Sequence, residues 1–133
     1  MSKFCILEKD KRPVSMIFRV DDHLRAGGDF KLFNPDTKEV MDHFKLSSEG
    51  GKTEPHIFKF DLESLNKMCL AWNVVICTKN ANNFKGNLEI DLMQMGLKTK
   101  TSDPIAWELE NIPPCGMGNY EKITGSVFFV VRS

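Results

Sequence analysis

Alternation of apolar and polar residues is the feature that most constrains what this chain can fold into. Val14, Met16, Phe18 and Val20 occupy every second position of one segment. The same pattern recurs over residues 58–62, 70–77, 88–93 and 105–110. Successive side chains of a strand point to opposite faces, so the pattern predicts strands with one face in a core and the other in water.

Turn-forming residues separate these segments. Gly, Pro, Asn and Asp cluster at 27–28, 34–36, 50–51, 80–86, 102–104 and 113–118. Such short, regular spacing is typical of sandwiches and barrels. We therefore predict an all-β fold, an antiparallel two-sheet β-sandwich of about 7–8 strands in one domain over residues 1–133. A small closed β-barrel is the alternative.

Two segments allow a local choice. Asn34-Pro35-Asp36 can cap a helix with Val40 on its apolar face, or can form the turn of a hairpin between 30–33 and 40–46. We favour the hairpin because the surrounding segments are strands. Residues 61–66 can form a single helical turn, the one short helix that we expect.

Composition argues against several classes of protein. The 133 residues include 18 basic and 18 acidic side chains, which give a formal net charge of +0. A balanced chain of this kind is unlike a general nucleic-acid binder, so no nucleic-acid partner is predicted. Ten Phe stand against one Tyr and two Trp. Because Phe has no polar tip and acts mainly by burial, we expect these aromatic residues to form a core.

The cysteines and the apolar segments indicate the cellular compartment in which this protein works. Cys5, Cys69, Cys77 and Cys115 form no CxxC pair and no set at zinc-binding spacing. No segment resembles a secretory h-region or is long enough to span a bilayer. The sequence thus predicts a cytoplasmic protein with reduced thiols. Export by a route that leaves no N-terminal signal is the alternative.

No cofactor is predicted. Asp21, Asp22 and His23 are three consecutive metal-ligand types, but adjacent side chains of an extended segment diverge. We interpret the triplet as a solvated strand end, and the sequence leaves metal binding there undecided. The chain has neither a P-loop nor a dinucleotide-binding motif, so no nucleotide is expected.

The C-terminal apolar run carries the first functional hypothesis. Val127, Phe128, Phe129, Val130 and Val131 are apolar on both faces, without charge or proline. Such a run belongs to a central strand or to an interface, because an uncovered one pairs with other chains. We therefore predict a non-enzymatic protein–protein interaction or assembly module. It would form a homo-oligomer or act as a subunit or inhibitor in a larger, bacterial-type complex.

Two alternatives belong to other functional classes. Trp72, Trp107 and Tyr120 can form a flat platform for a carbohydrate or another small ligand, although both Trp are in phase with apolar neighbours. Cys115 lies in a loop rich in Gly and Pro, where a nearby histidine can activate a thiolate for catalysis. The other three cysteines lie in apolar segments and are expected to fill the core.

Overall fold

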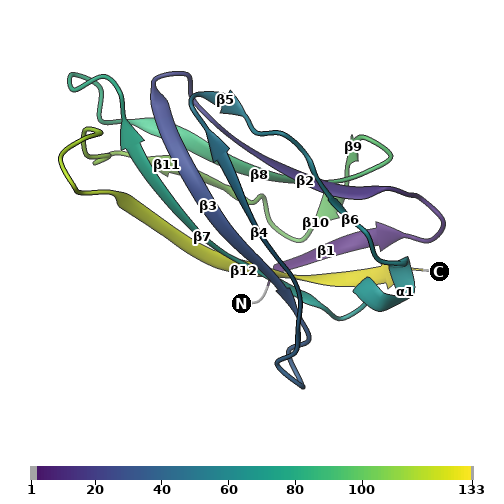
Figure 1. The fold of residues 1–133 in the computed structure, drawn as a ribbon. Helices are drawn as coiled ribbons and strands as arrows, with labels where there is room; N and C mark the ends of the chain where they lie inside the picture. The colour runs from purple at the N-terminus through teal and green to yellow at the C-terminus, as the bar shows by residue number, and fades with distance from the viewer. Residues whose placement is uncertain (1–2, 133) are drawn as a thin grey trace.

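The computed structural model describes residues 3–132, so residues 1, 2 and 133 of the predicted domain lie outside it. Sheet A contains, in spatial order, β10 (Lys100–Thr101), β1 (Lys3–Glu8), β12 (Glu121–Arg132), β7 (Cys69–Thr78), β3 (Leu24–Phe33) and β4 (Val40–Ser48). Sheet B contains β11 (Ala106–Leu109), β8 (Gly86–Gln94), β2 (Val14–Val20) and β5 (Gly51–Lys52), with β6 (His56–Phe58) on β2 and β9 (Leu97–Lys98) on β8. The predicted two-sheet sandwich is confirmed (Figure 1).

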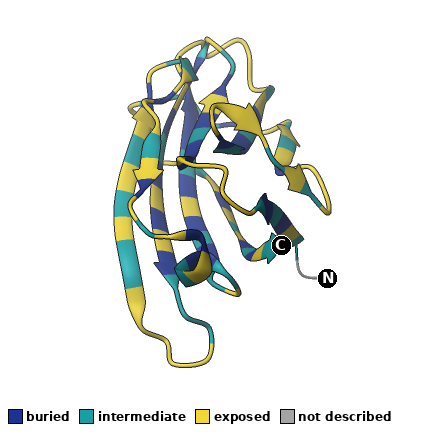
Figure 2. Cartoon of the chain, turned by 90° about the vertical axis from the view of Figure 1, so that its right-hand side faces the viewer, coloured by how far each residue is buried: buried dark blue, intermediate teal, exposed yellow. Residues whose placement is uncertain are grey.

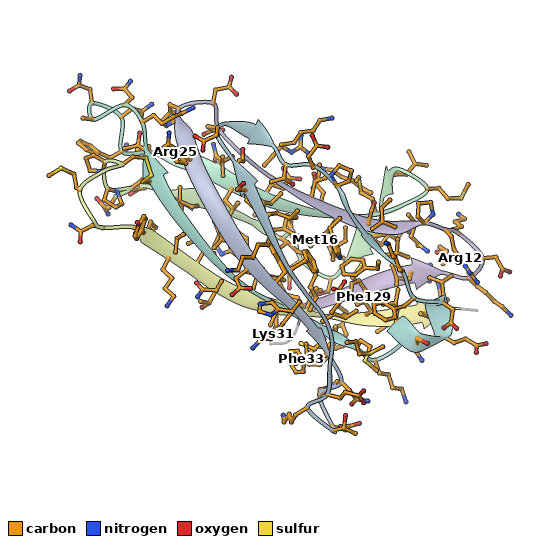
Figure 3. All side chains as sticks on the ribbon, in the orientation of Figure 1. Arg12, Met16, Arg25, Lys31, Phe33 and Phe129 are labelled. Carbon is orange, nitrogen blue, oxygen red and sulfur yellow. A yellow bond between two sulfur atoms is a disulfide. The ribbon has the colours of Figure 1, made fainter. Side chains whose placement is uncertain are left out.

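The core lies between the inner faces of the two sheets. Buried and exposed residues alternate along the strands, as the sequence pattern requires (Figure 2). Met16 of β2 and Phe129 of β12 both point into this interior, from opposite sheets (Figure 3). The expectation that Phe serves the core is wrong for Phe4 and Phe84, which are exposed.

The hairpin predicted at Asn34 is confirmed, because residues 34–39 join β3 to β4. The Asn34 side chain stabilises this turn by accepting a hydrogen bond of 2.9 Å from the backbone N–H of Asp36. The turn predicted at 27–28 is wrong, since both glycines lie inside β3. A Cβ on Gly28 would stand 2.5 Å from the ring of Phe30, so glycine there makes room for a buried side chain.

A single helical turn is confirmed at α1 (Leu62–Leu65). Asp61 caps it by accepting a 2.8 Å hydrogen bond from the backbone N–H of Ser64, which also lowers the pKa of the Asp61 carboxyl. Leu62 and Leu65 are buried in the core. No helix within residues 3–132 is long and apolar enough to cross a membrane.

Strand β12 lies inside sheet A, between β1 and β7. This position agrees with the interpretation of the apolar run as a central strand. It pairs antiparallel with β7 from Glu121 to Phe128, and parallel with β1 from Val127 to Arg132. The parallel pair departs from the antiparallel sheet that we expected. β1 itself has no counterpart among the predicted strands, because its apolar run is short and its partner lies at the far end of the chain.

Candidate functional site

The outer face of sheet A carries a cluster of apolar side chains that does not belong to the core. Phe4 and Ile6 of β1 lie directly opposite Phe128 and Val130 of β12 in the parallel register. The rings of Phe4 and Phe128 are 6.1 Å apart. Phe4 is 43% exposed and Val130 39% exposed, while Ile6 and Phe128 are half-buried. We call these four residues the outer patch.

Strand alternation explains how one apolar run serves two surfaces. Val127 and Phe129 point inward and are fully buried, and Val131 packs against the core. Phe128 and Val130 point the other way, into the outer patch. Of the five residues predicted as an interaction segment, therefore, the structure places these two on an accessible surface.

Polar residues border the outer patch. At one end Glu8 and Arg132 form an ion pair of 3.0 Å, and the guanidinium lowers the pKa of the Glu8 carboxyl. On β10, Lys100 lies opposite Ile6 in the register. On β12 the next outward positions toward the start of the strand are exposed Ser126 and Thr124. The patch is thus an apolar island with a partly basic border.

Cys115 is not a free thiol. It forms a disulfide with Cys77 of β7, 38 residues away in sequence. Two backbone hydrogen bonds align the loop with Thr78, one from the Cys115 N–H and one to the Pro113 carbonyl, each of 2.9 Å. The expectation of reduced thiols is wrong for this pair, because the fold sets the loop beside β7. No sequence motif marks a bond of this separation.

The other two cysteines are free and buried. Burial raises the pKa of the Cys5 thiol to about 11, and it also raises the pKa of Cys69. A thiol of this kind is a poor nucleophile at neutral pH. The thiol-dependent alternative is therefore not supported at Cys115, because that thiol is in a disulfide. The two free cysteines that the structure describes are not activated in its place.

The predicted aromatic platform is not assembled. Trp72 is 4% exposed and its ring meets Trp107 edge-on at 6.0 Å inside the sandwich. Tyr120 is exposed just before β12, and the first residue of that strand pairs with Ile76, four positions along β7 from Trp72. Flat stacking on a ligand needs accessible rings that lie together. The structure brings the two Trp together in the interior and leaves Tyr120 apart.

The acidic triplet is held by contacts within the protein. The Asp21 carboxylate accepts a 2.9 Å hydrogen bond from the Asn87 N–H, and the ring Nε2 of His23 lies 2.6 Å from the Lys85 carbonyl. Within residues 3–132 no three ligand-type side chains converge as a metal site would require. Residues 21–23 lie between the end of β2 at Val20 and the start of β3 at Leu24, which agrees with the interpretation of the triplet as a strand end.

Long-range pairing produces histidine–aspartate contacts that the sequence pattern did not identify. His56 Nε2 lies 2.8 Å from Asp42, and its ring stacks on Phe44 with centroids 3.5 Å apart, where β4 and β6 of opposite sheets meet. His43 similarly lies 2.5 Å from Asp29. The register of the β3–β4 hairpin is the signal that could have indicated this second pair.

A cluster of two acids and two bases lies on the outer face of sheet B. Arg19 donates to buried Asp91 at 2.6 Å, and Lys98 donates to Glu89 at 2.7 Å. Burial raises the pKa of Asp91, while Lys98 lowers that of Glu89. The formal charges cancel, and the Lys98 contact ties β9 to β8. The cluster therefore stabilises the β8–β9 hairpin.

Comparison with protein-family models, with curated proteins and with solved structures finds no match to this chain.

Proposed function

We propose that this protein is a protein–protein interaction module whose contact surface includes the outer patch. The observation that carries the proposal is the side-by-side placement of Phe4, Ile6, Phe128 and Val130 on the outer face of sheet A. Aromatic rings at the centre of an apolar island are typical of interface anchors. Core packing does not account for these four side chains, since none of them belongs to the core cluster.

The partner that fits best is another protein with an apolar and acidic surface. Lys100 adjoins the patch, and the Glu8 carboxylate is already engaged by Arg132. In a second copy placed face to face, the Glu8 carboxylate at the patch border is engaged by Arg132 and is not free to pair with Lys100. Four side chains also cover only on the order of 300 Å², less than the roughly 800 Å² per partner of a standard interface. The contact must therefore extend beyond the patch.

The disulfide bears on where such a module works. Cytosolic reductants keep most thiols reduced, whereas disulfides persist in oxidising compartments. The Cys77–Cys115 bond therefore supports the export alternative over the cytoplasmic expectation. We propose that the module meets its partner in an oxidising compartment, as a subunit or inhibitor of a larger assembly.

Site-specific photo-crosslinking in the native cells tests the proposal. The full chain carries p-benzoylphenylalanine at position 4, inside the patch, or at position 84, where an exposed Phe lies between β7 and β8 and away from β1 and β12. We expect position 4 to trap a discrete second protein, and position 84 to trap much less. Val130→Lys, which places a charge in the patch, should abolish the crosslink.

The outcomes of the crosslinking experiment decide whether the outer patch is a contact surface and what kind of molecule occupies it. Equal or absent crosslinking at positions 4 and 84 would contradict the outer patch as a contact surface. A product of twice the chain mass would show that the occupant is a second copy, against the partner that we propose. Circular dichroism of Val130→Lys controls for folding, because Val130 is exposed and its replacement should leave the sandwich intact.

A further inference from the structure

The turn between β8 and β9 contains a residue that its backbone geometry disfavours. Gln94 pairs with Leu97, so Met95 and Gly96 form a two-residue hairpin loop, with φ of +54° and +76°. Asn, Asp and Gly take such positive φ values readily, whereas other side chains are strained there. Of the non-glycine residues with positive φ in 3–132, Met95 is the one with an apolar side chain.

Burial does not compensate for this strain. Met95 is 60% exposed and Leu97, two residues on, is 73% exposed. An asparagine at position 95 would suit the turn better and would expose less apolar surface. The fold itself therefore gains little from methionine here. Strained residues of this kind cluster at functional sites, where the side chain has a use.

Met95 and Leu97 border a groove of about 440 Å³ between the hairpin and β1. Ile6 of the outer patch also lines the groove, so the two apolar surfaces are continuous. The Gln94 side chain fixes the hairpin beside β1 through amide hydrogen bonds to the carbonyls of Glu8 (2.9 Å) and Lys11 (2.8 Å). A groove held in this way is preorganised, which reduces the entropy lost on binding.

The charges along the groove favour an acidic ligand. Lys11, Lys98 and Lys100 line it together with Glu8. Arg132 already neutralises Glu8, and Lys98 is engaged by Glu89. The remaining basic groups, Lys11 and Lys100, therefore give the groove a net positive character. A ligand with apolar side chains next to carboxylates would pack against the apolar walls of the groove and neutralise its positive charge.

We infer that this groove binds an extended segment of the partner protein in which apolar residues alternate with Asp or Glu. The inference rests on the proposed function, because the groove continues the outer patch through Ile6. An extended segment presents alternate side chains to opposite sides, so its apolar residues can contact Met95 and Leu97 while its acidic residues face the lysines. Methionine suits such a site because its side chain adapts to the ligand.

Selection from a displayed library of random linear peptides against the full, disulfide-bonded chain tests this inference. We expect the selected peptides to be enriched in Asp or Glu next to Leu or Phe. The affinity of a selected peptide, measured by fluorescence anisotropy, should fall about tenfold or more for Leu97→Ser and for Lys100→Glu. The Lys100→Glu effect should diminish in high salt, which screens exposed charges.

Met95→Asn separates binding from stability. Relief of the strained φ should raise Tm by about 3 °C, while the loss of the side chain weakens peptide binding. Met117→Asn is the matched control, since Met117 is 69% exposed and lies outside the groove. It should leave peptide binding unchanged.

Peptides without acidic residues, or peptides that bind Met95→Asn and Leu97→Ser as well as they bind the unaltered chain, would overturn the inference. A selection that yields no peptide above the background of an empty support would overturn it too. The proposed function is tested separately by crosslinking at position 4. A trapped partner together with a failed selection would refute the groove alone.

Discussion

Removal of the Cys77–Cys115 disulfide should destabilise this protein more than most single substitutions do. The bond closes a loop of 38 residues. In the chain-entropy model, a cross-link of that span restricts the unfolded chain enough to contribute about 4 kcal/mol to the free energy of unfolding. That is a large share of the roughly 5–15 kcal/mol available to a typical domain. For a chain of this size it corresponds to a fall in Tm of about 12 °C.

The double variant Cys77→Ala with Cys115→Ala is the perturbation, because it leaves neither thiol unpaired. Urea unfolding without reductant, followed by intrinsic fluorescence, gives the free energy of unfolding of the unaltered chain and of the variant. A phosphine reductant added to the unaltered chain should reproduce the loss of about 4 kcal/mol. The same reductant should leave the double variant unchanged, since its other cysteines are already free.

Two results would refute this reasoning. A loss below about 1 kcal/mol would mean that the bond does not restrict the unfolded chain as the model requires. An equal effect of the reductant on both proteins would mean that it acts elsewhere. The outcome also bears on the proposed oxidising compartment, because a disulfide that contributes little would be weak support for it.

Three further measurements check the structure. Alkylation of the native protein at pH 8 should be slow at Cys5, because burial raises the pKa of that thiol to about 11. After denaturation, mass spectrometry should find two alkylated cysteines without reductant and four with it, because two cysteines are free and two form the disulfide. Gly125→Ala should lower the free energy of unfolding by about 1–3 kcal/mol, since the new Cβ would stand 2.8 Å from the Trp72 ring; unchanged urea unfolding would contradict that packing. Arg132 lowers the pKa of Glu8, so the stability from this pair is present above the ordinary Glu pKa of about 4.3 and is lost as pH falls through the lowered value. Glu8→Gln should therefore flatten the acid side of the curve of Tm against pH, and an unaltered curve would argue against the ion pair.

Sequence patterns predicted the features that depend on a few neighbouring residues. The alternation in 14–20 and 70–77 corresponds to β2 and β7, and the turn at Asn34 joins β3 to β4. The helical turn at 61–66 was also identified, because capping at Asp61 is a local interaction. The same rules failed at Gly28, where the requirement for glycine comes from the ring of Phe30 and not from a turn.

The candidate site was predicted only in part. Phe128 and Val130 belong to the run that the sequence singled out, but their companions Phe4 and Ile6 come from the opposite end of the chain. Neither strand has an apolar cluster of this size by itself. Parallel pairing of β1 with β12 creates it, and no local pattern encodes which strands become neighbours.

The sequence by itself determined the class of fold, because side chains that alternate in polarity can bury their apolar members only on one face of a sheet. The tertiary structure decided which strands pair, which half of the apolar run faces outward, and that Cys77 meets Cys115. These are contacts between residues far apart in the chain. They depend on the energies of the whole packed sandwich, so their consequences for function become visible only when the two sheets are assembled.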